Sequence, residues 1–115
     1  MARRRGRKRG DIDRLFREGR IHRGRWMHVR GLRVPQGRAV SEGRTLISVR
    51  KRFGSAVQRN RARRRIRAIC REAYPDGLSD ILLMISLADR ASLAGYQGLR
   101  ADLLAAFDAL GLQDP

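Results

Sequence analysis

The longest helical pattern of the chain lies between residues 55 and 74, where apolar side chains recur every three or four positions. Ser55 and Gln58 fit a capping box, in which the first side chain caps the helix and the second reaches back to the cap. Pro75 and Gly77 follow the last apolar position and end the pattern. The sequence therefore predicts a helix of about five turns, in a stretch that is also unusually rich in arginine.

Two further helical patterns stand near the ends of the chain. In the first, which begins at residue 11, Ile12, Leu15 and Phe16 share one face, and Gly19 offers a stop. The second begins at Tyr96 and predicts an amphipathic helix at the end of the chain. Its apolar positions are Leu99, Leu103, Phe107 and Leu110.

Three segments carry strand patterns. Residues 26–34 alternate in their first half before Gly31 interrupts them, and residues 44–51 form a second segment. With one loop between them, these two segments are expected to pair as an antiparallel hairpin. Residues 81–88 are a continuous apolar run, which is typical of a central strand buried on both faces. The pattern leaves open whether residues 26–34 divide into two strands.

The predicted elements follow the order helix, strand, strand, an optional further strand, helix, strand and helix, or α-β-β-(β)-α-β-α. This order predicts an α+β or α/β sandwich in which helices cover a small mixed sheet. The strand, helix and strand between residues 44 and 88 form a βαβ crossover, which is usually right-handed. Residues 1–10 have almost nothing to bury and are expected to form a disordered basic tail, whereas residues 11–115 are expected to form a single domain.

Charge distinguishes this chain from an ordinary small domain. Its net charge is +16 over 115 residues, and like charges repel within a compact state unless an anionic partner relieves them. Residues 1–76 hold 25 Lys and Arg against 6 Asp and Glu, whereas residues 77–115 hold 2 against 5. The last third is therefore the apolar part of the domain, and a polyanion is the expected partner.

Residue content disfavours several other classes of protein. Cys70 is the single cysteine, so an intramolecular disulfide is excluded and a cytoplasmic location is expected. No apolar run approaches the roughly 20 residues of a membrane span, so no membrane partner is expected. His22, His28 and Cys70 lack the spacing of metal ligands, and no triad or carboxylate pair suggests catalysis. We therefore expect no catalytic residue, no metal ligand and no cofactor bound by the protein itself.

The arginine-rich helix separates into two faces when its residues are placed at about 100° intervals. Small and apolar residues within about 60° of Ile66 form a stripe that suits docking on a sheet. The stripe consists of Ala62, Ile66, Ile69, Cys70 and Ala73. One flank, between roughly 60° and 160°, holds Asn60, Arg63, Arg64, Arg67 and Arg71. A merely solvated face would mix charges of both signs, so this flank predicts polyanion binding.

Basic residues also precede this helix. Arg50, Lys51 and Arg52 lie at the end of a predicted strand, and Gly54 permits a tight turn. Backbone amides at the start of a helix, beside these cations, would form a phosphate site. Such contacts supply affinity and salt dependence without sequence specificity.

The stretch KRFGSAVQRNRARRRIR, residues 51–67, resembles the signature of the protein subunit of bacterial ribonuclease P. The matching positions are Lys51, Gly54, Ala56, Val57, Arg59, Asn60, Arg61, Arg63, Arg64 and Arg67. The resemblance covers nearly the whole chain, including an early helix with Phe16 and a final helix with Tyr96 near its start. It implies an α/β sandwich whose βαβ crossover is left-handed, against the usual preference.

The same resemblance implies the function. A member of this family binds the catalytic RNA of ribonuclease P, here expected as a monomer in a 1:1 complex, and assists removal of the 5′ leader from precursor tRNA. The RNA and its Mg²⁺ carry out the hydrolysis, so the protein is a non-catalytic subunit of an endoribonuclease. The alternative from composition is a structural arginine-rich ribosomal or other RNA-binding protein, and a DNA-binding module comes third because no helix-turn-helix spacing is evident.

The resemblance also assigns residues to two surfaces. The residues expected to face the RNA are Arg50, Lys51, Arg52, Arg59, Asn60, Arg61, Arg63, Arg64, Arg67 and Arg71. A cleft between the sheet and the first helix is expected to hold the leader, through Ile12, Phe16, Trp26, His28 and Arg30. Trp26, His28 and Arg30 are expected on one alternating face of their strand. Because aromatic residues are few, arginine stacking is expected to help hold the bases.

Overall fold

The computed structural model describes residues 12–33, 44–75 and 81–112. Helical residues 12–18 come first. They are followed by β1 (Arg20–Arg23), β2 (Met27–Arg33), β3 (Arg44–Val49), η1 (Lys51–Phe53), α2 (Ala56–Ala73), β4 (Ile81–Leu87), η2 (Asp89–Leu93) and α3 (Tyr96–Ala109). The predicted basic tail, the start of the domain at residue 11, and Gly77 lie outside the described residues.

The four strands form one mixed sheet in the order β1-β2-β4-β3. β4 pairs antiparallel with β2 and parallel with β3. The predicted hairpin between the second and third strands is therefore wrong. β4 is the most apolar strand, and in its inner position five of its seven residues are buried. The predicted β3–α2–β4 crossover is confirmed as a parallel unit, and its left-handedness stays a prediction from the resemblance.

The optional further strand exists as β1, which precedes Trp26. The segment that follows Trp26 forms the single strand β2 and is not divided. β1 pairs antiparallel with β2, and the Gly24 amide donates to the Met27 carbonyl at 2.9 Å to close the hairpin. Asp102 of α3 holds the turn, because its carboxylate accepts from the backbone amides of Arg25 and Trp26 at 3.0 and 2.8 Å. Trp26 is thus a turn residue and not the first residue of a strand.

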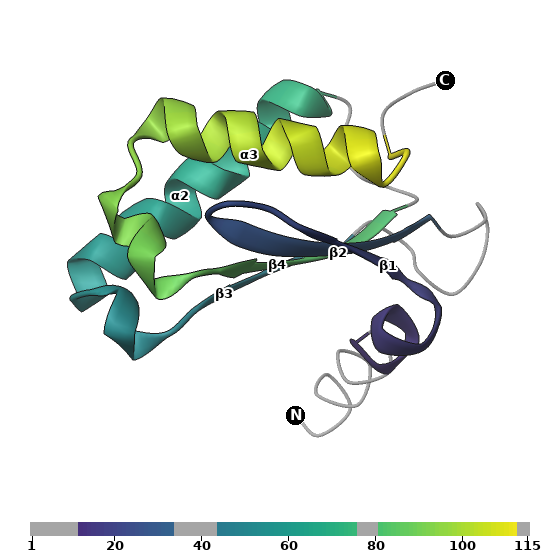
Figure 1. Ribbon diagram of the computed structural model, residues 1–115, viewed down its shortest axis with the longest axis horizontal. Helices are drawn as coiled ribbons and strands as arrows, with labels where there is room; N and C mark the ends of the chain where they lie inside the picture. The colour runs from purple at the N-terminus through teal and green to yellow at the C-terminus, as the bar shows by residue number, and fades with distance from the viewer. Residues whose placement is uncertain (1–11, 34–43, 76–80, 113–115) are drawn as a thin grey trace.

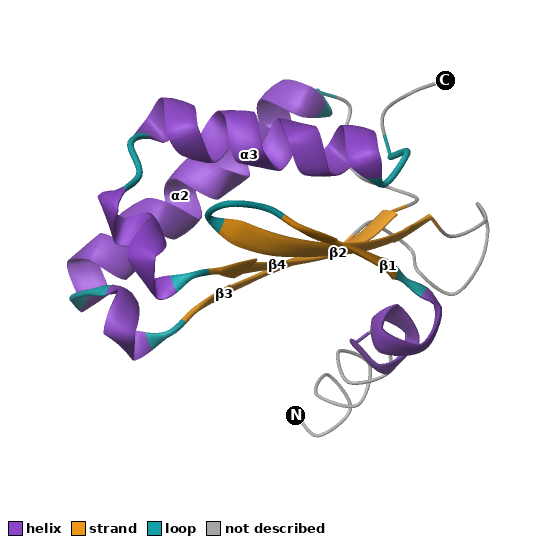
Figure 2. Ribbon diagram, in the orientation of Figure 1, coloured by secondary structure: helices purple, strands orange, loops and turns teal. Residues whose placement is uncertain are grey.

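The helices lie on both sides of the sheet. α2 and α3 cover one face, and helical residues 12–18 lie on the opposite side (Figures 1 and 2). The main core fills the space between α2, α3 and the sheet, and its fully buried side chains include Ile66, Leu103 and Phe107. A second, smaller cluster forms on the other face, where Leu15 packs with Leu82. This arrangement leaves the rest of that second face open for binding.

α2 follows the sequence prediction closely. The Ser55 hydroxyl accepts from the Gln58 amide at 3.2 Å, and the Gln58 side chain accepts from the Ser55 amide at 2.7 Å, so the capping box is confirmed. The predicted stripe is also confirmed, because Ala62, Ile66, Ile69 and Cys70 are buried and Ala73 packs beside them. Burying a side chain such as that of Ile66 contributes about 1.5–3 kcal/mol. The apolar stripe therefore fixes which flanks of α2 remain exposed.

Candidate nucleic-acid interface

One flank of α2 forms a continuous basic surface, the α2 ridge, made of Asn60, Arg63, Arg64, Arg67 and Arg71. Four of these residues, together with Val57, line a shallow hollow. Arg63 donates to the Asn60 side-chain carbonyl at 3.0 Å, which orients both groups. Among the described residues, no ion pair involves a member of the ridge. The ridge therefore offers several guanidinium groups to an external anion.

The opposite flank of α2 faces α3. Glu72 on that flank forms an ion pair with Arg100 of α3, and the hydrogen bond from Arg100 lowers the pKa of the Glu72 carboxyl. The members of the α2 ridge lie roughly 80° to 180° from Glu72 around the helix, so the ridge is directed away from α3. Docking on the sheet and on α3 thus leaves the ridge as an outer surface of the molecule.

The residues expected from the family motif do not all belong to this surface. Arg59 folds back and donates to the Gly54 carbonyl at 2.7 Å. Arg61 lies on the α3 side of the helix, where it lines a different hollow with Arg65. Arg61 therefore lies on a different flank of α2 from the ridge, because a helix separates residues two positions apart by about 200°. Its expected contact with RNA stays a prediction.

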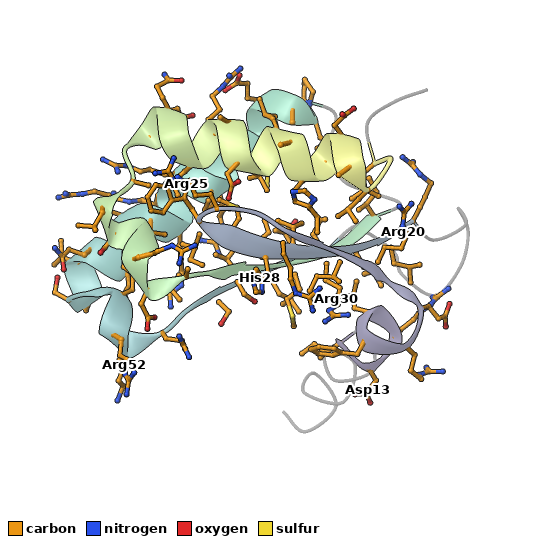
Figure 3. The ribbon with its side chains drawn as sticks, in the orientation of Figure 1. Asp13, Arg20, Arg25, His28, Arg30 and Arg52 are labelled. Carbon is orange, nitrogen blue, oxygen red and sulfur yellow. The ribbon has the colours of Figure 1, made fainter. Side chains whose placement is uncertain are left out.

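Three more predicted residues lie in the connection from β3 to α2. Lys51 and Arg52 are exposed, and Arg52 projects outward at the end of the molecule opposite Arg20 (Figure 3). Arg50 forms a two-pronged ion pair with Asp89 of η2, with Nη2–Oδ2 and Nε–Oδ1 distances of 3.0 and 3.3 Å. Its side chain nevertheless remains 69% exposed. This pair holds Arg50 at the end of β3 and leaves much of its guanidinium accessible.

The open face of the sheet carries a row of polar side chains. His28, Ser86 and Ser48 are neighbours in register on β2, β4 and β3, so they share one face of the sheet. Together with Arg50 they line a shallow pocket. The row offers an imidazole, two hydroxyls and a guanidinium, which are groups that hydrogen-bond to sugar, phosphate or base edges.

An aromatic ring lies one row further along this face. Leu15 anchors the first helix against Leu82, and this places Phe16 above β2. The Arg30 guanidinium lies 4.4 Å from the centroid of the Phe16 ring, between the sheet and the helix that carries Asp13 (Figure 3). Phe16 is still 55% exposed, and Ile12, one turn earlier, is half-buried. A ring and a planar cation at an open cleft can stack on unpaired bases.

Trp26 is absent from this cleft. It packs against the main core on the α3 side of the sheet. There its Nε1 lies beside Gly98 of α3, 3.4 Å from the position that a Cβ on Gly98 would occupy. The Arg25 guanidinium covers its ring at 4.8 Å. The prediction that Trp26 shares a face with His28 is wrong, because strand alternation does not extend into the two-residue turn.

The sequence predictions overlooked Ser48, Ser86 and Arg65. The two serines had a signal, since each is a small polar residue near the end of an apolar strand, but only the pairing through β4 brings them together.

Among the described residues no three His, Cys, Asp or Glu side chains gather in a metal-binding group. Within the same part of the chain no helix is long and apolar enough to cross a membrane.

The comparisons with known proteins agree with this geometry. A family model described as Ribonuclease P matches residues 2–111. The chain belongs to this family. The ribonuclease P protein component of Thermus scotoductus is 38% identical over 103 residues, and that of Thermus oshimai is 37% identical over 99 residues. The matches cover 87% and 86% of this chain but only 58% and 60% of these relatives, so the chain spans about six-tenths of their length.

Solved structures of ribonuclease P proteins share the fold. The Staphylococcus aureus RNase P protein superposes with a TM-score of 0.75 at 19% identity, covering 91% of this chain and 93% of that protein. The Thermotoga maritima RNase P protein gives a TM-score of 0.68 at 21% identity, with coverages of 93% and 94%. At such low identities the likeness establishes the α+β architecture of the family and not the role of each residue.

Proposed function

We propose that this chain is the protein subunit of ribonuclease P, which binds the catalytic RNA and the 5′ leader of precursor tRNA and assists removal of the leader. The observation that carries the proposal is the α2 ridge. It is a row of arginines along one flank of a helix whose apolar stripe is buried, in a chain that belongs to the ribonuclease P family. The family match disfavours the alternative of an arginine-rich ribosomal protein.

The protein contributes charge and position, and the RNA with its Mg²⁺ contributes the chemistry. Two RNA molecules repel each other, and a chain with a net charge of +16 lowers that repulsion by neutralising phosphates at their contact. Multiple arginine–phosphate contacts also give strong salt dependence without reading the sequence. No metal ion or cofactor needs to be bound by the protein for this role.

The open face of the sheet is the proposed path of the leader. Single-stranded RNA is held by stacking on aromatic and guanidinium planes and by hydrogen bonds to its exposed edges. Phe16 with Arg30 supplies the planes, and His28, Ser48 and Ser86 supply hydrogen-bonding groups in the adjacent row. The protein acts in this proposal as a monomer in a 1:1 complex with the RNA, in the cytoplasm and without a membrane partner.

Reconstitution with a bacterial ribonuclease P RNA tests the proposal. At a Mg²⁺ concentration where the RNA alone is nearly inactive, adding the protein is expected to restore cleavage of precursor tRNA at its mature 5′ end. Polyarginine at equal total charge is the control for charge without a fold, and it should not restore accurate cleavage. The complex should also bind precursor tRNA more tightly than leaderless tRNA. Absence of stimulation by the protein would refute the proposed function.

A further inference from the structure

Arg50 and Asp89 lie at the same edge of the sheet. β3 and β4 are parallel, with Val49 beside Leu87, so the residues that follow these two strands emerge next to each other. His28 lies at the same edge, because it stands near the start of the antiparallel strand β2. In open α/β sheets, ligands are commonly bound outside the carboxyl ends of parallel strands. This edge is therefore a place where a bound group is expected.

The backbone directs Arg50 toward the open face of the sheet. Arg50 is extended, with φ −77° and ψ 160°, so it continues the alternation of β3. Ser48 lies on the open face, Val49 is buried in the main core, and Arg50 returns to the open face. Arg50 therefore belongs to the pocket of His28 and Ser86 and not to the hollow of the α2 ridge.

Asp89 fixes the direction of the Arg50 guanidinium. Its carboxylate accepts from both Nε and Nη2 of Arg50, and its own side chain is only 28% exposed. The η2 segment that carries Asp89 is itself held in place, because Arg90 donates from Nη2 to the Arg25 carbonyl at 2.8 Å. This bond ties η2 to the turn between β1 and β2. Asp89 is thus an acceptor whose position the fold determines.

The ion pair leaves part of the Arg50 guanidinium for a ligand. Nη1 makes no hydrogen bond within the described residues, and the side chain is 69% exposed. A long side chain that is already ordered does not have to be immobilised when a ligand binds. Guanidinium groups bind phosphate oxygens through paired N–H groups. Arg50 is therefore a phosphate donor that is oriented before binding.

We propose that Asp89 is a positioning residue for the 5′ leader: it holds Arg50 at the edge of the open face, where the guanidinium binds a leader phosphate. This inference rests on the proposed function. The leader is the occupant because Arg50 lines the same pocket as His28, Ser48 and Ser86, which lie on its proposed path. A phosphate contact does not depend on the base, so Arg50 adds affinity for leaders of any sequence.

Asp89→Asn distinguishes positioning from simple charge. On charge alone, removing a carboxylate from beside a phosphate site strengthens the binding of a polyanion. Positioning predicts the opposite result for the affinity ratio, which compares binding of precursor tRNA and of leaderless tRNA to the reconstituted holoenzyme. This ratio should fall roughly twofold to tenfold. The control, Asp108→Asn, removes the same charge from an exposed residue of α3 and should leave the ratio unchanged. An unchanged or raised ratio in Asp89→Asn would overturn the inference.

Two double variants separate positioning from folding. In Arg50→Asp with Asp89→Arg the ion pair can form again with its partners exchanged, so thermal stability should recover while the affinity ratio stays low. Arg50→Gln should lower the ratio roughly tenfold. Adding Asp89→Asn to Arg50→Gln should have no further effect, because Asp89 acts through Arg50. A full recovery of the ratio in the exchanged variant, or an equal effect of Asp89→Asn with and without Arg50, would contradict the positioning role.

Neutral methylphosphonate links in the leader test the bound group. Each link is introduced singly at a 2′-deoxy position, and the matching 2′-deoxy phosphodiester is its control. One link should weaken binding of precursor tRNA to the wild-type holoenzyme but not to the Arg50→Gln holoenzyme. Equal losses in both, or no loss at any position, would refute the phosphate contact. If wild-type protein stimulates cleavage and favours precursor over leaderless tRNA while these tests fail, the proposed function stands and only the roles of Arg50 and Asp89 are refuted.

Discussion

Neutralising two members of the α2 ridge should remove a defined part of the salt dependence of RNA binding. Arg64 and Arg67 are exposed, and they line one hollow with no ion-pair partner among the described residues. Substituting both by Gln removes the charge and keeps a polar side chain of similar helix propensity. The folded state should therefore persist, and the variant reports on the two lost charges.

The expected magnitude follows from counterion release. If each arginine contacts one phosphate of duplex RNA, the slope of log affinity against log salt falls by about 0.9 for each, or about 1.8 for the pair. A fourfold rise in salt, from about 50 to about 200 mM, should then weaken wild-type binding roughly 12-fold more than it weakens the variant. The two proteins should differ most at low salt and converge as salt rises.

Filter binding or fluorescence anisotropy across a salt series measures these slopes directly. The double variant Arg17→Gln with Arg20→Gln serves as the charge-matched control, because both side chains are exposed and neither belongs to the proposed interface. An unchanged slope for the ridge variant would mean that the ridge is only solvated. A loss equal to that of the control would mean that total charge matters and position does not.

Two further predictions concern the stability of the helix that carries the ridge. Ser55→Ala should lower the free energy of unfolding by about 1 kcal/mol in chemical denaturation, because it removes the capping box; an unchanged midpoint would contradict this. Burial raises the pKa of the Cys70 thiol from 9.0 to about 11, so the unfolded chain ionises first. Stability should fall between pH 9 and 11 by up to roughly 2–3 kcal/mol more than in Cys70→Ala; parallel pH profiles would refute it.

The sequence predicted α2 well because several independent signals agree there. The cap, the apolar period and the terminating Pro75 all depend on neighbouring residues, so local physics decides them. The burial of β4 could also be predicted, because an apolar run of that length in a small domain is typical of a buried strand. These two elements account for the docking of the ridge and for its direction.

Strand pairing could not be read in the same way. The choice between joining β2 to β3 or joining each to β4 depends on which arrangement buries β4, and that is a property of the whole sheet. Trp26 was misplaced for a related reason, because the hairpin turn is defined by its contact with Asp102, 76 residues away. Arg61 was grouped by its motif, although its helical angle already separated it from the ridge.

The inner position of β4 has a consequence for the order in which the molecule is assembled. β2 and β3 do not pair with each other, and β4, which joins them, is synthesised after both. Until residue 87 has been synthesised, the chain contains most of its arginines but lacks the complete sheet that positions them. The open face that faces the proposed leader comes into existence only with β4. The last third of the chain, which is the least charged part, therefore completes the sheet that holds the earlier basic residues in place.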